Sequence, residues 1–342
     1  MYSTDEVAGR LITYAKRNYI KNQSVFFACP IIIPQIIWAV YTEPVSLLLA
    51  SVPLIYTIPI FITLDRVEPE PRVAKIYAFS YGAIVATSIA LIINGIVDSV
   101  LGSKSSIVLS APIAEEGLKF LGLLWAYRKR LIGGPLDGVV YAALIALGFA
   151  SVENIFYFST AASEGVLGTT FILRGILSPF AHPLFTMWTG IFLGKAIQKH
   201  KRISNHAVMG LSLSVALHGL WNTSAVLGNL AAILILLIAP FFVFVFDYSI
   251  LYIYRLRKAE ETSFQFNAKL VAQHFEISPE KAEIYGFFAD SMKLRKKLNR
   301  KQKKVFDQQR TAFSQLVSMF SNPATIRQNE VDELINQINS IS

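Results

Sequence analysis

SSIVLSAPIAEEGLKFLGLLWAY, residues 105–127, is an apolar segment that carries two adjacent carboxylates, Glu115 and Glu116, and an ammonium group, Lys119, near its middle. The segment is long enough to cross a bilayer as a helix, which takes about 20 apolar residues. A charged side chain such as Asp or Lys at the bilayer centre costs roughly 2.5 to 3.5 kcal/mol on insertion scales. Three charged groups in one segment therefore indicate a functional site inside a membrane-spanning helix.

The composition of the whole chain is that of a membrane protein. Hydrophobic residues make up 53% of the 342 residues and charged residues only 16%, and the mean hydropathy is +0.46. Soluble domains carry about 25% charged residues. The single cysteine, Cys29, excludes an intramolecular disulfide and a C-x-x-C metal or redox motif. The charged start of the chain has no cleavage-site pattern, so we expect the first apolar run to remain as a membrane anchor.

Eight apolar runs are long enough to span a membrane as helices. They lie at residues 24–41, 45–64, 76–97, 105–127, 136–158, 169–198, 206–227 and 230–254. Basic residues gather before the first run and after the second, fourth, sixth and eighth, and the other connections carry almost none. Because Lys and Arg favour the cytoplasmic side, this alternation predicts an all-α, multi-pass protein of the cell membrane with both termini in the cytoplasm. The sixth run contains Pro179 and Pro183, so it is either a kinked helix or a re-entrant piece followed by a full span.

The chain is expected to have three parts: a cytoplasmic segment at 1–23, a transmembrane core at 24–254 and a basic, helical cytoplasmic tail at 255–342. In the tail, Ser278 followed by proline has the form of a helix start. Basic residues from Lys293 to Lys304 then precede an apolar set that runs from Phe306 to Phe320. Such a helix suits anionic lipid headgroups. A charged face on a helix packed against its own domain or a partner explains the pattern equally well. Cytoplasmic loops account for the net charge of +9, so nucleic acid is not an expected partner.

Polar groups recur at similar depth in four of the predicted spans. At about 1.5 Å per residue, Glu115, His182 and His218 lie near the bilayer midplane, and Glu153 lies toward the outer side. Polar groups in a membrane avoid isolation by facing one another, which predicts a shared buried pocket. His218 and Asn222 are four residues apart and share a helix face, as do Glu115 and Lys119. The neighbouring residue Glu116 points about 100° away.

The chemistry available to these groups is activation of water. A carboxylate in a dry pocket can take a proton from water that attacks a carbonyl. Imidazole and amide groups can then bind a metal or stabilise the oxyanion. Two carboxylates and two histidines could also supply a three-ligand zinc site and a base. The chain has no H-E-x-x-H motif, so the spacing alone does not require a metal.

Several separated motifs carry a resemblance to a known family. They are AEEGLK at 114–119, DGVVYA followed by GFASVEN ending at Asn154, AHPLFT at 181–186 and HGLWN at 218–222. As a set they resemble the PrsW family of intramembrane proteases, which is related to the type II CAAX prenyl endopeptidases and bacteriocin-immunity membrane proteins. The prenyl endopeptidases have a histidine four residues after a phenylalanine, whereas here Phe149 is followed at that spacing by Glu153, as in the PrsW pattern. The water-activating glutamate and histidine pair of the prenyl endopeptidases therefore does not transfer directly.

The resemblance implies a protease that hydrolyses a peptide bond of membrane-anchored protein substrates, with the glutamate pair and the histidines in the active site. We expect Glu115 to be the general base, and Glu116 to be a ligand or an orienting partner. His182 and His218 would bind a metal, with Zn²⁺ the candidate, or orient water and stabilise the oxyanion without one; Asn222 would assist. Glu153 would be a third ligand or a proton shuttle. The expected ligand set is thus His182, His218, Glu153 and Glu116.

Two other classes of protein remain open from the residues alone. In a transporter or channel, the same buried charges would relay protons or hold an ion. The chain has no internal repeat, and its polar groups cluster at one depth, which argues against transport. The third reading is a catalytically silent relative that binds membrane partners.

Overall fold

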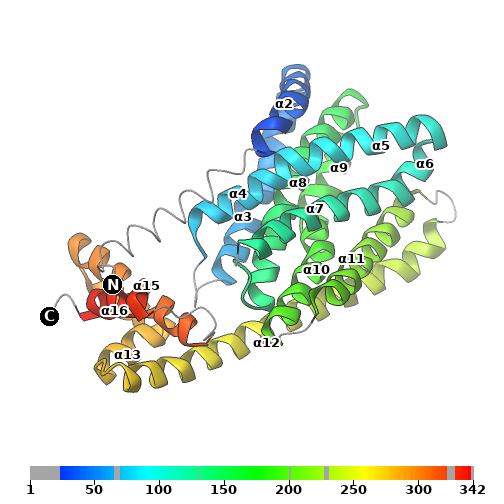
Figure 1. Cartoon of the computed structure of the whole chain (residues 1–342). Helices are drawn as coiled ribbons and strands as arrows, with labels where there is room; N and C mark the ends of the chain where they lie inside the picture. The colour runs from blue at the N-terminus through cyan, green and yellow to red at the C-terminus, as the bar shows by residue number, and fades with distance from the viewer. Residues whose placement is uncertain are drawn as a thin grey trace. The chain divides into compact units, whose positions relative to one another are not determined.

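The computed structural model describes residues 24–64, 70–129, 131–199, 202–226, 231–321 and 328–339, and every regular element among them is a helix (Figure 1). The prediction of an all-α polytopic membrane protein is confirmed. The predicted N-terminal segment at 1–23 lies outside the described residues. The described residues form two compact units, a membrane unit that ends at Ile253 and a tail unit that begins at Tyr254.

The helices of the membrane unit follow the predicted runs closely. They are α2 (Ser24–Thr42), α3 (Val45–Leu64), α4 (Arg72–Ser80), the π-helical η1 (Tyr81–Ala86), α5 (Thr87–Leu101), α6 (Ser103–Ser105), the π-helical η2 (Ser106–Ser110), α7 (Ala111–Arg128), α8 (Pro135–Ser163), α9 (Leu167–Phe171), the π-helical η3 (Ile172–Leu177), α10 (Ala181–Gln198), α11 (Ile203–Val226) and α12 (Ala231–His274). Each predicted run falls on helix, apart from residues 178–180 in the sixth run. Residues 227 and 230 lie outside the described part of the chain.

By length and composition, five of the described stretches qualify as membrane spans: Val45–Leu64, Arg72–Leu101, Pro135–Ser163, Leu167–Gln198 and Ile238–His274. Pro30–Thr42 is a shorter apolar helix. The helix with Glu115, Glu116 and Lys119 is not among the five. The predicted sixth span is an interrupted helix, because the backbone leaves the helical conformation between η3 and α10.

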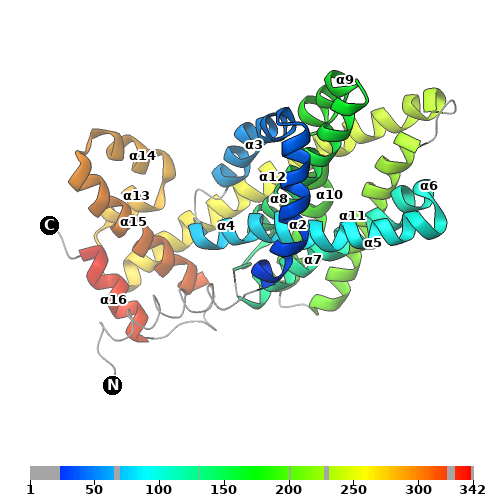
Figure 2. The same ribbon diagram turned by 90° about the horizontal axis from the view of Figure 1, so that it is seen from above.

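Helix α8 is the central helix of the membrane unit. In its most apolar window 83% of the residues are buried, against 28% in α3. It packs most extensively on α10 and α3, and Figure 2 shows it among these helices. Glycines permit the close approach: a Cβ on Gly138 of α8 would lie 2.1 Å from the carbonyl oxygen of Gly190 of α10. Small residues at such crossings let membrane helices come into backbone contact.

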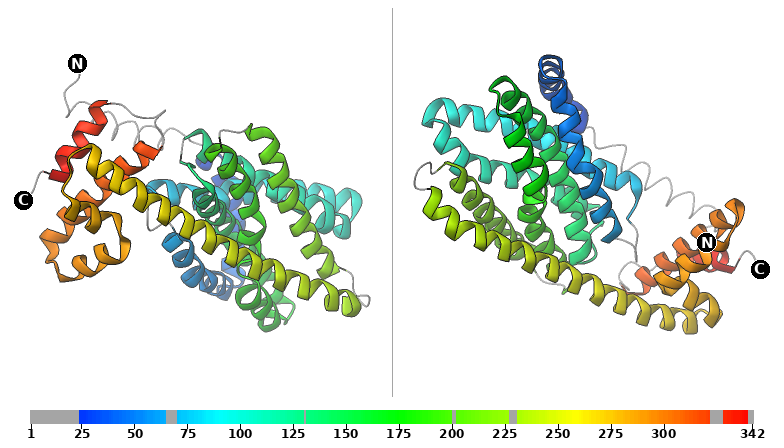
Figure 3. Two further views of the ribbon diagram at one scale, coloured as in Figure 1. Left: turned by 90° about the horizontal axis from the view of Figure 1, so that it is seen from below. Right: turned by 180° about the vertical axis from the view of Figure 1, so that it is seen from behind.

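The membrane portion of α12 runs along the outside of the bundle (Figure 3). Aromatic side chains attach it to α10: Phe242 contacts Phe185 edge to face, with ring centroids 6.2 Å apart, and Tyr248 stacks on Trp188 at 6.1 Å. These contacts hold the membrane portion of α12 against α10.

The tail unit has a hydrophobic core of its own. It contains the end of α12 and four helices, α13 (Pro279–Gly286), α14 (Phe288–Lys297), α15 (Arg300–Ser321) and α16 (Gln328–Asn339). The predicted helix start is confirmed, because the Ser278 hydroxyl accepts a hydrogen bond from the Lys281 backbone N–H and α13 begins at the following proline. The single helix expected from there to Phe320 is wrong. Phe287 is extended between α13 and α14, and Asn299 caps a new helix, α15.

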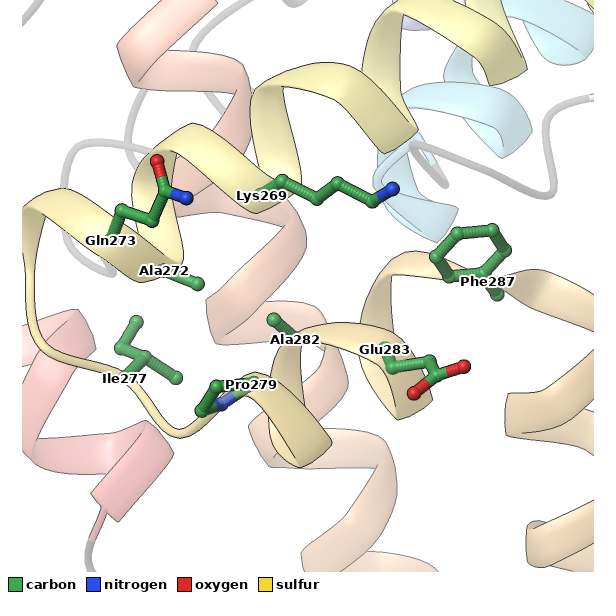
Figure 4. A pocket seen from close by; sticks show the side chains of 8 residues that line it. All are labelled: Lys269, Ala272, Gln273, Ile277, Pro279, Ala282, Glu283 and Phe287. Atoms are coloured by element: carbon green, nitrogen blue, oxygen red, sulfur yellow. The ribbon is translucent and has the colours of Figure 1, made fainter.

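The apolar set of the predicted tail helix lies inside this core. Phe306, Phe313, Leu316 and Val317 are buried, and the side chain of Phe320 lies outside the described residues. The apolar face of this helix therefore packs on its own domain, which was one of the two alternatives, and contact of its basic residues with lipid headgroups stays a prediction. A cavity of about 400 Å³ lies between α12 and α13, and Figure 4 shows the side chain of Lys269, which lines it, extending toward Phe287.

Candidate active site

Four helices of the membrane unit bring the predicted ionisable side chains to one place. Glu115 and Glu116 come from α7, Glu153 from α8, His182 from α10 and His218 from α11. Glu115, Glu116 and His218 are at most 4% exposed, and the side chains of His182 and Glu153 are 12% and 18% exposed. A cavity of about 220 Å³ is lined by four of the five, and Glu116 lies behind its wall. The shared pocket expected from their depths is present.

A set of three potential metal donors stands out within this group. Glu115, His182 and His218 each offer one ligand atom, and these atoms lie within 4.8 Å of one another. The Oε2 atom of Glu115 is 3.8 Å from Nε2 of His218. This Oε2 is buried and has no hydrogen-bond partner among the described residues. Oε1 accepts one long hydrogen bond, 3.3 Å from Nδ2 of Asn94.

The hydrogen bond to Nδ1 of His218 determines its tautomer, and the tautomer determines which atom faces Glu115. Its Nδ1 lies 3.1 Å from Oε1 of Glu116. A carboxylate only accepts hydrogen bonds, so Nδ1 carries the proton and Nε2 presents a lone pair toward Glu115. Two electron-rich atoms facing each other in a buried site repel unless a cation or a hydrogen-bond donor lies between them. Carboxylate oxygen and imidazole nitrogen are ligands that zinc prefers, so these residues fit a divalent metal.

Two of the expected ligands instead lie behind the histidine rings. Glu116 accepts from Nδ1 of His218, and Glu153 Oε2 lies 2.9 Å from Nε2 of His182. Carboxylates in this position fix the tautomer and the orientation of metal-binding histidines. Both ring nitrogens of His182 are engaged, because Nδ1 lies 3.0 Å from the ammonium group of Lys119.

A buried lysine and a half-buried arginine compensate the two supporting carboxylates. Lys119 is fully buried and donates to Glu116 at 2.8 Å, and its Nζ lies 4.3 Å from the ring centroid of Phe149. Arg174, on the π-helical η3, forms an ion pair with Glu153. Lys119 is farther from Glu115, at 3.8 Å from Oε2. Of the three carboxylates, Glu115 is thus the one without a close cation partner, which suits a carboxylate that must react or bind.

Asn222 lies at the edge of the site. It lines the cavity, but its amide donates to the backbone oxygen of Ile107 at 2.9 Å. It therefore joins α11 to η2 in this structure and does not contact the three donors. The assisting role expected for Asn222 stays a prediction.

Sequence reasoning missed two residues that support the glutamates. Asn94 on α5 donates to Glu115 and accepts from the Ser110 hydroxyl at 3.0 Å. Thr186, one turn after His182 on α10, donates to Oε2 of Glu116 at 2.8 Å. An asparagine inside an apolar run is a sequence signal for an interhelical hydrogen bond, because side-chain amides in membrane helices hydrogen-bond to neighbouring helices. Thr186 carries no such signal, since threonine is ordinary in membrane helices.

Comparisons with known proteins identify a family. Residues 70–248, just over half of the chain, match the model of a family described as PrsW family intramembrane metalloprotease. Curated relatives named Protease PrsW include one from Geobacillus kaustophilus, 31% identical over 46% of this chain and 69% of its own length. Another, from Clostridioides difficile, is 28% identical over 56% of this chain and 83% of its own. No solved structure matches the chain significantly. The motifs, the helical membrane fold and the family match lead to one conclusion: this chain belongs to the PrsW family of intramembrane metalloproteases.

Proposed function

We propose that this chain is an endopeptidase that hydrolyses a peptide bond in membrane-anchored protein substrates, with Glu115 as the group that activates water. The observation that carries the proposal is the buried Oε2 of Glu115, which accepts no hydrogen bond from the described residues and faces the lone pair of His218 across 3.8 Å. A water molecule or a metal ion is the kind of species that such a gap accommodates. The cavity beside it, about 220 Å³, has room for a stretch of substrate backbone.

The metal is proposed to be zinc, held by His182, His218 and Glu115. When bound, it would supply a Lewis acid that polarises the water or the scissile carbonyl. The family description favours a metal, and the nitrogen and oxygen donors favour zinc among the common ions. For His182 to contribute Nδ1, Lys119 has to give up that nitrogen and keep its bond to Glu116, while Nε2 remains on Glu153.

The residues of the chain have separate tasks in this mechanism. The carboxylate of Glu115 has two oxygens, so one can serve as a donor to the metal while the other accepts the proton of the attacking water. The same carboxylate can return that proton to the leaving amine. Glu116 and Glu153 keep His218 and His182 in the orientation that presents a nitrogen to the site. Lys119 and Arg174 hold those two carboxylates in their charged form within the membrane.

The test combines metal content with proteolysis. Full-length protein purified in detergent is compared with Glu115→Gln and with a His182→Ala, His218→Ala double variant; Glu164→Gln, at an exposed turn after α8, is the matched control. We expect one zinc per chain in the wild type and the control, and none in the double variant. Cleavage of single-pass membrane proteins co-expressed with the enzyme should stop in Glu115→Gln.

Three outcomes would contradict parts of this proposal. Unchanged cleavage by Glu115→Gln would remove its role as base. Active wild-type protein without metal would leave Glu115 acting on water alone. A proton flux that depends on Glu115, with no cleavage by any variant, would favour the transport alternative.

The partners and the topology are proposals of the same kind. We infer that both termini are cytoplasmic, from the alternation of basic loops, and that the tail contacts anionic lipid headgroups. Five exposed basic residues, which form no short ion pair with another described residue, cluster where α14 meets α15: Lys296, Lys297, Arg300, Lys301 and Lys304. Liposome binding by the fragment from Glu260 onward should weaken strongly as salt is raised, because the Debye length shrinks to about 3 Å at 1 M. Salt-independent binding, or none, would end this idea.

A further inference from the structure

A groove on the membrane unit lies beside the catalytic cavity. It measures about 470 Å³ and runs between α2 and α8. Its wall is formed by Pro34, Gln35, Trp38, Ala39, Phe156, Ser159 and Thr160. Phe156 also lines the cavity that contains Glu115 and the histidines. The groove and the cavity therefore share one aromatic side chain as part of their walls.

The groove and the site lie at the same level along α8. At about 1.5 Å per residue, Gln35 lies roughly 10 Å from the Thr42 end of α2, inside the apolar helix. On α8, Phe156 follows Glu153 by three residues, so both lie on neighbouring faces of the same turn. An occupant of the groove would therefore run within one helical turn of the catalytic side chains.

Gln35 requires a partner that lipid does not provide. Its Nε2 donates one hydrogen bond to the carbonyl oxygen of Ile31, at 3.1 Å. The side chain is exposed, and no other hydrogen bond to it is found among the described residues. Its second N–H and its Oε1 would face hydrocarbon, where an unsatisfied amide costs several kcal/mol. An acyl chain cannot bond to these atoms, but a polar side chain or a backbone carbonyl on another helix can.

We propose that this groove binds the transmembrane segment of the substrate, with a small or polar residue of that segment against Gln35. The substrate then passes Phe156 to reach the catalytic cavity. The proposal rests on the proposed protease function, since it supplies the docking site for that reaction. Trp38, 69% exposed, forms the outer lip of the groove and offers a large apolar surface to an incoming helix.

Photo-crosslinking in nanodiscs tests the site without requiring catalysis. Benzoylphenylalanine replaces Trp38 in the full-length Glu115→Gln protein; the control places it at Ile37, which is 62% exposed but does not line the groove. The probe is a synthetic Leu/Ala transmembrane peptide with one Asn in its outer half, and a second peptide has Leu at that position. An interhelical hydrogen bond in a membrane is expected to favour the Asn peptide about three- to twenty-fold.

The expected result is crosslinking from position 38 well above position 37, with the Asn preference abolished by Gln35→Leu. Thr160→Trp, which fills the groove from an exposed position, should lower the yield from position 38. Equal yields at both positions, lipid adducts alone, or crosslinked pairs of this chain would overturn the proposal. If crosslinking maps to the groove but no form of the protein cleaves a substrate, the docking site stands and the protease proposal falls. If cleavage depends on Glu115 but crosslinking is unselective, the protease proposal stands and the docking site falls.

Discussion

Replacing Gly190 by alanine should force α8 and α10 apart at their closest crossing. A Cβ at Gly190 would lie 2.1 Å from the carbonyl oxygen of Gly138 and 2.5 Å from its carbonyl carbon. Both are backbone atoms, so no side-chain rotation relieves the clash. Ordinary contacts begin at 3.4 Å, and the two backbones must therefore separate by about 1.3 Å.

The change in folding stability caused by Gly190→Ala follows from two opposing effects. Overpacking a well-packed interior destabilises by about 1 to 3 kcal/mol, and alanine favours a helix over glycine by about 1 kcal/mol. We expect a net loss of up to about 2 kcal/mol, which lowers the melting temperature by up to about 8 °C for a unit of this size. Activity should fall further than stability. Glu153 and His182 sit on the two separated helices, 2.9 Å apart, and a misplacement of about 1 Å can lower a rate about 100-fold.

Stability is assayed by heating the detergent-purified protein and measuring the fraction that remains monodisperse by size-exclusion chromatography. Zinc content and substrate cleavage are measured on the same protein. Gly117→Ala is the matched control, because a Cβ at Gly117 on α7 has nothing within 4 Å although its neighbour is Glu116. We expect this control to be as stable as the wild type or slightly more so. A Gly190→Ala protein with wild-type stability and activity would refute the argument, as would equal losses in both variants.

Three further outcomes are expected. Lys119→Met should destabilise by about 3 to 5 kcal/mol, because it leaves Glu116 buried without its cation, and adding Glu116→Gln should recover part of that loss in thermal unfolding. Phe313→Ala should destabilise the tail core by about 3 to 5 kcal/mol, seen as faster proteolysis of the tail in the full chain with unchanged zinc content. Arg295→Ala removes a pair with Asp307 whose side chains are 39% and 46% exposed, so its effect should stay below about 1 kcal/mol.

The predicted site residues show where sequence reasoning succeeds. Glu115, His182 and His218 could be grouped from sequence because each is an ionisable residue inside an apolar run, and their depths follow from counting residues along helices of known rise. The same reasoning did not separate the proposed metal ligands from the carboxylates that hydrogen-bond the two histidines. Glu116 and Glu153 carry the same chemical group as Glu115, and their different positions depend on the rotation of α7 and α8 about their axes.

The tail shows what sequence reasoning could not predict. Its basic and apolar residues have the pattern of an interfacial helix, and the pattern alone does not say what covers the apolar face. Phe306 and Phe313 are covered by the tail's own helices, which pack from distant parts of the sequence. A break at Phe287 and a cap at Asn299 redirect the chain so that those helices meet.

The sequence by itself determined that this is a helical membrane protein, where its apolar helices lie, and which of its ionisable residues line one cavity. These properties depend on local hydrophobicity and helical rise, which neighbouring residues along the chain set. Only the tertiary structure decided that Glu115 faces His218, that Glu116 and Glu153 stand behind the histidines, and that α2 and α8 form a groove beside them. Those contacts join residues far apart in the sequence, and they depend on how closely glycines let the helices cross and how each helix is turned.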